Sequence, residues 1–218
     1  MTQTQTVERE NAAPERKYEL TGETITTPSG RTLHRIRALV AIAAIGVSAG
    51  DLGGFIETDD NLDMFGDAWV FGNARVFGNA RVFGNAQVFG NAQVFGNAWV
   101  FGNAWVSGNA QVFGNARVSG DAQVSGNARV SGDAWVSLNI HVGWHSHVGS
   151  ENGTLTWFRT QTGGISVNHG CFYGTLPEFE GAVQKAHGDN QTAREYGLLV
   201  QFIKLRASAW PADNKEAA

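Results

Sequence analysis

Three histidines that lie close together, His141, His145 and His147, are the first residues of this chain that could do chemistry. Imidazole nitrogens are common zinc ligands and the usual general bases near neutral pH. His141 and His147 hold equivalent places in two successive six-residue units, described below, so they should point outward from adjacent faces and diverge. We therefore predict no metal site and no catalytic residue here, and we expect solvated imidazoles or imidazoles packed in a cap.

Cys171 is a second candidate, because it lies in His169-Gly-Cys-Phe-Tyr-Gly174 with His187 downstream. A thiol beside an imidazole can act as a nucleophile. A lone cysteine is more often a small buried side chain, and we interpret Cys171 in that way. A single cysteine also excludes an internal disulfide and fits a reducing compartment.

The element that positions these residues is an internal repeat. From Leu62 to Gly149 the unit Ala-x-Val-Phe/Ser-Gly-Asn/Asp recurs every six residues, and its aliphatic places run from Met64 to Val148. This composition favours short strands broken by turns. Alternation puts Ala and Val on one side of each strand, whereas the x places include arginines that cannot be buried unpaired. Ala and Val are therefore the predicted core, x and Phe/Ser point outward, and Gly and Asn form corners where positive φ is often required.

One flat strand and one corner per six residues close into a triangular prism with 18 residues per coil. The 88-residue span therefore gives about five coils, which stack to roughly 24 Å at the spacing of neighbouring strands. Residues 18 apart should lie above one another on three outer faces. The first face carries Trp69, Gln87, Trp105, Gln123 and His141; the second carries Arg75, Gln93, Gln111, Arg129 and His147; the third carries Asp63, Arg81, Trp99, Arg117 and Trp135.

The outward phenylalanines form columns as well, and these change to serine farther along the chain. Their columns are Phe65, Phe83 and Phe101; Phe71 and Phe89; and Phe77, Phe95 and Phe113. Three interpretations stay open: the aromatic rings only stack on the next coil, they form a self-association interface, or the Trp and Arg side chains stack on a ligand. We take the phenylalanines as the candidate interface and, as candidate binding residues, Trp69, Trp105, Arg81, Trp99, Arg117 and Trp135.

A repeat of this kind cannot close its own ends, so the flanking segments should be caps. We predict a disordered tail at 1–16, an N-terminal β cap at 17–61, the repeat at 62–149, a C-terminal α+β cap at 150–210 and a tail at 211–218. The C-terminal cap should hold two strands, at 153–159 and 164–168, and two helices, at 175–186 and 192–207. We expect the caps to fix the register, so that a deletion of 18 residues is tolerated and a deletion of six is destabilising.

The units, such as Ala74-Arg-Val76-Phe-Gly-Asn79, resemble the hexapeptide-repeat superfamily. The whole arrangement, with Gly50-Asp-Leu-Gly-Gly-Phe-Ile-Glu57 before the repeat and Gly170-Cys-Phe-Tyr-Gly-Thr-Leu176 after it, resembles phage and prophage repeat proteins often labelled polymer-forming. The resemblance implies a mainly β fold, a left-handed parallel β-helix with an N-terminal β cap and a C-terminal ββαα cap. It also raises acyltransferase activity, with a general-base histidine near an extruded loop, but the repeat has no such loop and no histidine before His141.

We therefore expect a non-catalytic scaffold that self-associates or binds a partner, with a trimer favoured because many left-handed β-helices trimerise along flat faces. A protein that sequesters a nucleotide or sugar is the alternative, and an acyltransferase is the third. No cofactor is expected. A net charge of −4 gives no reason to expect nucleic acid, and the apolar stretch 38–49 is too short to span a membrane. The expected location is the cytoplasm of a bacterial host cell.

Overall fold

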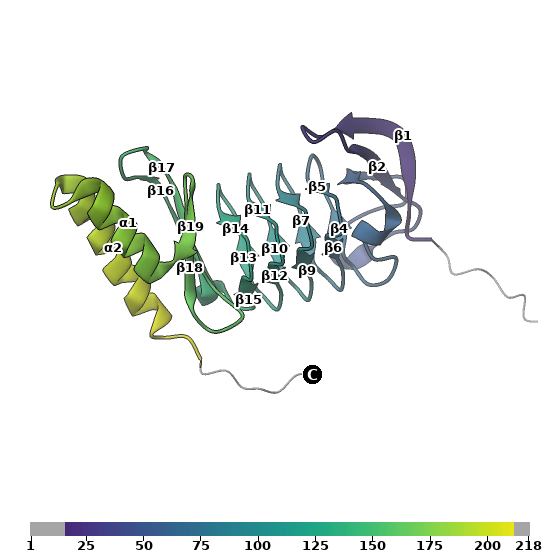
Figure 1. Cartoon of the computed structure of the whole chain (residues 1–218). Helices are drawn as coiled ribbons and strands as arrows, with labels where there is room; N and C mark the ends of the chain where they lie inside the picture. Colours follow the sequence, from purple (N-terminus) through teal and green to yellow (C-terminus); the bar gives the residue numbers. More distant parts are fainter. Residues whose placement is uncertain (1–15, 212–218) are drawn as a thin grey trace, which may run out of the picture.

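The computed structural model describes residues 16–211, which form a mainly β protein built on a parallel β-solenoid of about five turns. The predicted terminal tails lie outside these residues, apart from Arg16 and Pro211. Figure 1 shows the solenoid in the middle, with an antiparallel hairpin at its N-terminal end and two helices at its C-terminal end.

Twelve two-residue strands wind into three flat sheets. The first face consists of β4 (Trp69–Val70), β7 (Gln87–Val88), β10 (Trp105–Val106) and β13 (Gln123–Val124). The second consists of β5 (Arg75–Val76), β8 (Gln93–Val94), β11 (Gln111–Val112) and β14 (Arg129–Val130). The third consists of β6 (Arg81–Val82), β9 (Trp99–Val100), β12 (Arg117–Val118) and β15 (Trp135–Val136).

Parallel pairing joins residues 18 apart, which confirms the predicted coil. On the third face Arg81 pairs with Trp99 and Arg117 pairs with Trp135, and the other two faces follow the same register. The winding sense stays a prediction from the resemblance.

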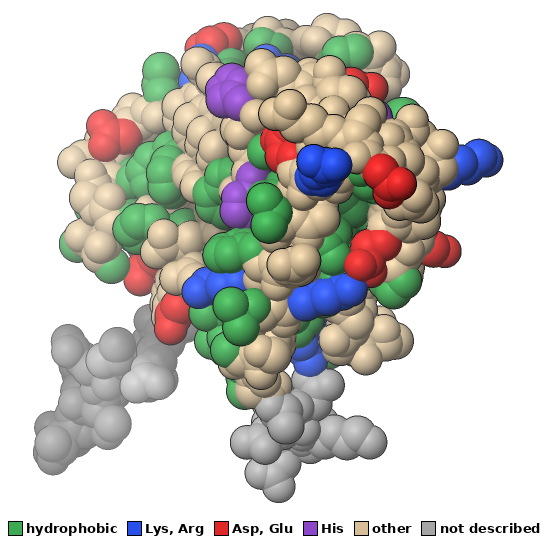
Figure 2. All heavy atoms as spheres, turned by 90° about the vertical axis from the view of Figure 1, so that its left-hand side faces the viewer, with side chains coloured by type: hydrophobic (Ala, Val, Ile, Leu, Met, Phe, Trp, Pro, Cys, Tyr) green, Lys and Arg blue, Asp and Glu red, His purple; other side chains and the backbone are tan. Residues whose placement is uncertain are grey.

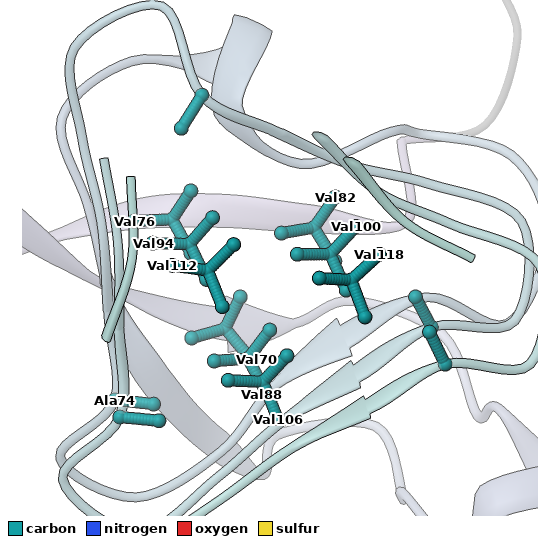
Figure 3. Close-up of a cluster of buried hydrophobic side chains, with 14 of the residues drawn as sticks. Val70, Ala74, Val76, Val82, Val88, Val94, Val100, Val106, Val112 and Val118 are labelled. Atoms are coloured by element: carbon teal, nitrogen blue, oxygen red, sulfur yellow. The ribbon is translucent and has the colours of Figure 1, made fainter. Parts of the chain in front are cut away.

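The core lies along the solenoid axis and is built from alanine and valine, as the alternation predicted. The repeat valines from Val70 to Val136 are 0% exposed, and Figure 3 shows those from Val70 to Val118 in three stacked columns that point toward one another. Burying one valine side chain is worth about 1.5–3 kcal/mol. The valine columns therefore hold the coils together.

The corners are formed by glycine, which alone takes the left-handed conformation there. Gly84, for example, has a φ of 71°, and a Cβ on it would lie 3.2 Å from the backbone nitrogen of Gly102 in the next coil. The following Asn has another role, because its Nδ2 donates to the Oδ1 of the residue 18 positions later. These ladders are Asn79–Asn97–Asn115–Asp133, Asn85–Asn103–Asp121 and Asn91–Asn109–Asn127.

The N-terminal cap is an antiparallel sheet of β1 (Tyr18–Thr26), β2 (Thr32–Ala38) and β3 (Leu52–Ile56), with short 3-10 helices at Ala43–Ile45 and Asp59–Asn61. Strand β3 then pairs in parallel with β5, so the cap continues directly into the second face. The Lys17 ammonium donates to the carbonyl of Ala68 at 2.9 Å and covers an open edge of the first coil.

The first rung of the solenoid differs from the prediction. Leu62, which is 0% exposed, pairs with Val82, whereas Met64 was expected beside that valine. The segment between Leu62 and β4 is two residues longer than a regular unit. Met64 therefore lies partly buried at the margin of the core.

The C-terminal cap is a four-stranded antiparallel sheet covered by two helices. Its elements are β16 (Val142–Val148), β17 (Gly153–Arg159), β18 (Ile165–His169), β19 (Phe172–Thr175), α1 (Leu176–His187) and α2 (Gln191–Ala207). The predicted strands at 153–159 and 164–168 and both helices are present, and two further strands flank them. Thr175 caps α1 through the predicted box with Glu178.

The repeat was expected to continue to Gly149, but parallel pairing ends with β15. The chain forms a 3-10 helix at Asn139–His141 and then β16, which pairs antiparallel with β17. None of the helices among residues 16–211 is long and apolar enough to cross a membrane.

Candidate functional site

The third face is where the structure brings the predicted Trp and Arg side chains together. The Arg117 guanidinium carbon lies 4.9 Å from the ring centroid of Trp99 and 5.5 Å from that of Trp135. Such contacts are worth about 0.5–1 kcal/mol each at exposed sites. Arg81 is exposed and in register beside Trp99, but no cation–π contact joins them among the described residues.

Two of the three predicted phenylalanine columns stack along the axis, and their stacked rings are half-buried. In the remaining column no ring contact joins Phe71 and Phe89 among residues 16–211. Phe77 and Phe95 have centroids 5.0 Å apart with planes 2° from parallel, and Phe113 continues that stack. Phe83 and Phe101 stack at 4.9 Å. Much of the apolar area of these rings is therefore used within the molecule, as cross-strand pairs use it. Their role as an interface stays a prediction.

The first face holds less exposed aromatic surface than predicted. Trp69 is only 1% exposed, because Tyr18 of the N-terminal cap packs edge-on against it with centroids 6.2 Å apart. The surface placement of Trp69 was therefore wrong. Trp105 is 43% exposed and contacts Phe89 edge-on, while Phe71 packs against the core.

The top of the third face also differs, because Phe65 does not belong to the Phe83 column. The Asp63 amide donates to the Val82 carbonyl at 3.0 Å, as the Phe83 amide donates to Val100 at 3.1 Å. Asp63 thus holds the place expected for Phe65. Phe65 itself is 71% exposed in the irregular segment before β4.

The three histidines are separated by the start of the C-terminal cap. His141 was expected on the first outer face, but it is 3% exposed and packs edge-on against Trp210 at 5.7 Å. His145 packs edge-on against Phe202, and His147 is exposed. Among residues 16–211 no three His, Cys, Asp or Glu side chains are placed to hold a metal ion.

Burial makes His141 a pH-dependent element of stability. Desolvation, together with the charge of Arg159, lowers the pKa of His141 to about 4, and burial also lowers the pKa of His145. In the unfolded chain this histidine has a pKa of about 6.5. As the pH falls below that value, the unfolded chain therefore binds a proton at this residue, whereas the folded protein does not. The contribution of His141 to stability is therefore complete above about pH 6.5 and is lost as the pH falls from 6.5 to 4.

We expect the free energy of unfolding to fall by about 2–3 kcal/mol between pH 7 and pH 4.5 from this group. The measurement is urea denaturation at both pH values for the wild type and for His141→Phe, which keeps a ring under Trp210 but cannot be protonated. The variant should lose markedly less stability over this interval. Equal losses in the two proteins would contradict the assignment.

Cys171 is exposed in the turn between β18 and β19, so its expected burial was wrong. The adjacent His169 is instead the buried member of the motif and is 8% exposed. Its Nε2 lies 2.8 Å from the Tyr196 hydroxyl, which orients the imidazole toward α2. His187 lies beside the same tyrosine ring, with centroids 5.9 Å apart.

A cavity of about 700 Å³ between the last coil and the C-terminal cap was missed by sequence reasoning. Its walls come from the corner at Asp133, the β17–β18 turn (160–164), β19 and the start of α1. The polar turn and the tyrosine in the 170–176 motif were visible in the sequence. Nothing local indicated that they would meet the end of the repeat.

The helical end of the molecule carries an exposed apolar strip that was also unexpected. Leu198, Phe202 and Leu205 of α2 are 68%, 43% and 72% exposed. Figure 2 views this end and shows hydrophobic side chains reaching the surface among scattered charged groups.

The repeat is similar to a known sequence family, described as the YdcK beta solenoid repeat. The matches cover residues 74–90, 92–108, 110–123 and 122–137, which lie within the solenoid. No curated protein matches the chain. Fold and repeat together define the class of this protein: it is a β-solenoid repeat protein.

Proposed function

We propose that this protein is a non-catalytic scaffold, of the phage or prophage type in a bacterial cytoplasm, that self-associates through the third face of its solenoid. The observation that carries the proposal is the aligned Trp99–Arg117–Trp135 column on a flat sheet. Trp and Arg are the residues most enriched among interface hot spots.

The composition of the third face is that of a protein interface. Among residues 16–211 neither Arg81 nor Arg117 forms an ion pair, and the x places of β6, β9, β12 and β15 hold no acidic side chain. The neighbouring Phe83 ring meets Trp99 edge-on at 6.0 Å, which broadens the aromatic strip. Aromatic side chains and arginine with few acids are typical of interface cores.

The caps restrict self-association to a lateral mode. The N-terminal sheet and the β16–β19 sheet lie at opposite ends of the solenoid (Figure 1), so its strand edges are covered and coils of two molecules cannot stack end to end. Side-by-side packing of flat faces remains. We favour a trimer, because many proteins of the β-helix superfamily that the repeat resembles form trimers along flat faces.

The test is the mass in solution, measured by light scattering after size exclusion. The wild type is expected near 70 kDa, three times the 23.4 kDa chain. The double variant Trp99→Gln/Trp135→Gln should run as a monomer, because it removes both indoles that hold Arg117. Glutamine already occupies the x places at Gln87, Gln93, Gln111 and Gln123, so the variant should keep the fold.

The matched control is Trp105→Gln, which removes an exposed indole of the first face and should leave the mass unchanged. If the wild type were a monomer at micromolar concentration, the proposal would be contradicted. Dissociation by the control to the same extent as by the double variant would place the interface elsewhere.

A further inference from the structure

We propose that the cavity between the last coil and the C-terminal cap binds a neutral, hydroxyl-rich ligand of the size of a mono- or disaccharide. The cavity of about 700 Å³ falls within the range of about 300–1,000 Å³ typical of small-molecule sites. The lining of this cavity does not include Trp99, Arg117 or Trp135, so the proposal does not depend on self-association through them.

Tyr173 supplies an aromatic wall. A Cβ on Gly132 would lie 1.8 Å from the Tyr173 hydroxyl oxygen, so the tyrosine fits against the solenoid only because glycine stands at that corner. The side chain still exposes 50% of its surface, and it lines the cavity. A fixed, half-exposed ring can pack against the C–H face of a pyranose. Leu176 and Ile165 contribute apolar surface to the lining of the cavity.

Polar groups that suit hydroxyls also line the cavity. Asp133 ends an asparagine ladder, and its exposed carboxylate receives one long hydrogen bond, 3.5 Å from Asn115 Nδ2. Its backbone carbonyl accepts from the Gln161 amide at 2.9 Å, which fixes the β17–β18 turn beside it. The Asp133 carboxylate thus has free acceptor capacity, and the exposed Gln161 side chain can both donate and accept.

The same lining disfavours anions such as nucleotides. Lys204, its cation, pairs with Glu180 at 2.7 Å, which leaves Asp133 as the unpaired charge of the cavity. Helix α1 begins here, but the Thr175–Glu178 box occupies the amides of these two residues and Pro177 has no N–H. A phosphate would therefore meet no free cation and a helix N-terminus that is already partly occupied. An uncharged polyol suits a cavity lined by the Tyr173 ring, the Asp133 carboxylate and the Gln161 amide.

The experiment is saturation-transfer NMR on the full chain with methyl β-D-glucopyranoside, methyl α-D-mannopyranoside, maltose and glucose 6-phosphate as probes. Each probe is used at about 10 mM, so that a site with a Kd on the order of 1 mM would be mostly occupied. We expect transfer to at least one of the three neutral sugars and none to glucose 6-phosphate. If no neutral sugar shows transfer, or if the phosphate binds as well as its best neutral counterpart, the proposal is overturned.

Two variants locate the binding. Asp133→Asn keeps the corner, since asparagine fills the equivalent places at Asn79, Asn97 and Asn115, and it should weaken binding about tenfold by removing the charged acceptor. Tyr173→Ala should abolish the transfer, whereas Tyr173→Phe should retain it. Unchanged binding by Asp133→Asn and Tyr173→Ala would place the sugar elsewhere and refute the site. The light-scattering mass of these variants should match the wild type, so failure here is distinguishable from failure of the third-face interface.

Discussion

Deleting six residues, Ala92–Asn97, is expected to leave a folded protein, whereas deleting three, Ala92–Val94, is expected to unfold it. Removing one whole unit keeps Ala and Val at every inward place, because each later residue moves on by one face of the prism. Removing half a unit shifts the pattern so that Phe and Asn take the inward places. Buried unpaired amides and lost valine contacts then cost more than the roughly 5–15 kcal/mol that stabilise a typical domain.

The measurement is a thermal melt followed by circular dichroism, and deletion of a full coil, Ala92–Asn109, is the matched control. We expect the six- and 18-residue deletions to melt within about 10 °C of the wild type, because solenoid stability is roughly a sum over neighbouring repeats. The three-residue deletion should show no cooperative transition. If the six-residue deletion behaved like the three-residue one, the inward pattern of the six-residue unit would not be what holds the coils.

The expected tolerance of the six-residue deletion differs from what the sequence alone suggested. The expectation was that rotating one cap by a third of a turn would destabilise the protein. Each cap, however, is joined to its own end: β3 pairs with β5, and β17 crosses the end of the solenoid, where Thr160 bridges Ala134. Figure 1 shows the caps at opposite ends, so their relative rotation breaks no shared contact.

The interior of the solenoid could be predicted because its cause is local and repeated. Alternation and the cost of burying arginine decide which side faces inward, and the same decision recurs in each unit. The start of α1 was predictable for a similar reason, since Thr175 and Glu178 satisfy each other's backbone amides within one turn. In such segments the neighbours in sequence are sufficient to determine the structure.

The ends of the solenoid could not be predicted, because there the partners are distant in sequence. Val142 keeps the aliphatic place of the repeat, yet it begins an antiparallel strand that pairs with β17. Trp69 and His141 hold outward places of the pattern, yet Tyr18 and Trp210 cover them. The cavity at Asp133 belongs to the same category, since it exists only where a corner of the repeat meets the C-terminal cap.

Phe158 is the residue through which the C-terminal cap closes the solenoid, and replacing it by alanine is expected to cost about 3–5 kcal/mol. The side chain is 0% exposed and belongs to the same apolar cluster as the repeat valines. Its neighbours Leu155 and Trp157 belong instead to the cluster beneath α1 and α2. Phe158 thus fills the open end of the valine columns, and its loss leaves a cavity that Val142 is too small to fill.

Urea denaturation provides the measurement, and Phe202→Ala is the matched control because this ring, also in the C-terminal cap, is 43% exposed. The control should lose only about half as much, since 43% of Phe202 is exposed and less apolar area is removed from water there. The two variants remove the same atoms, so the difference between them measures how strongly the cap is bound to the end of the prism. A loss at Phe158 no greater than the loss at Phe202 would mean that the last coil is stable without the cap, and that the solenoid closes its own C-terminal end.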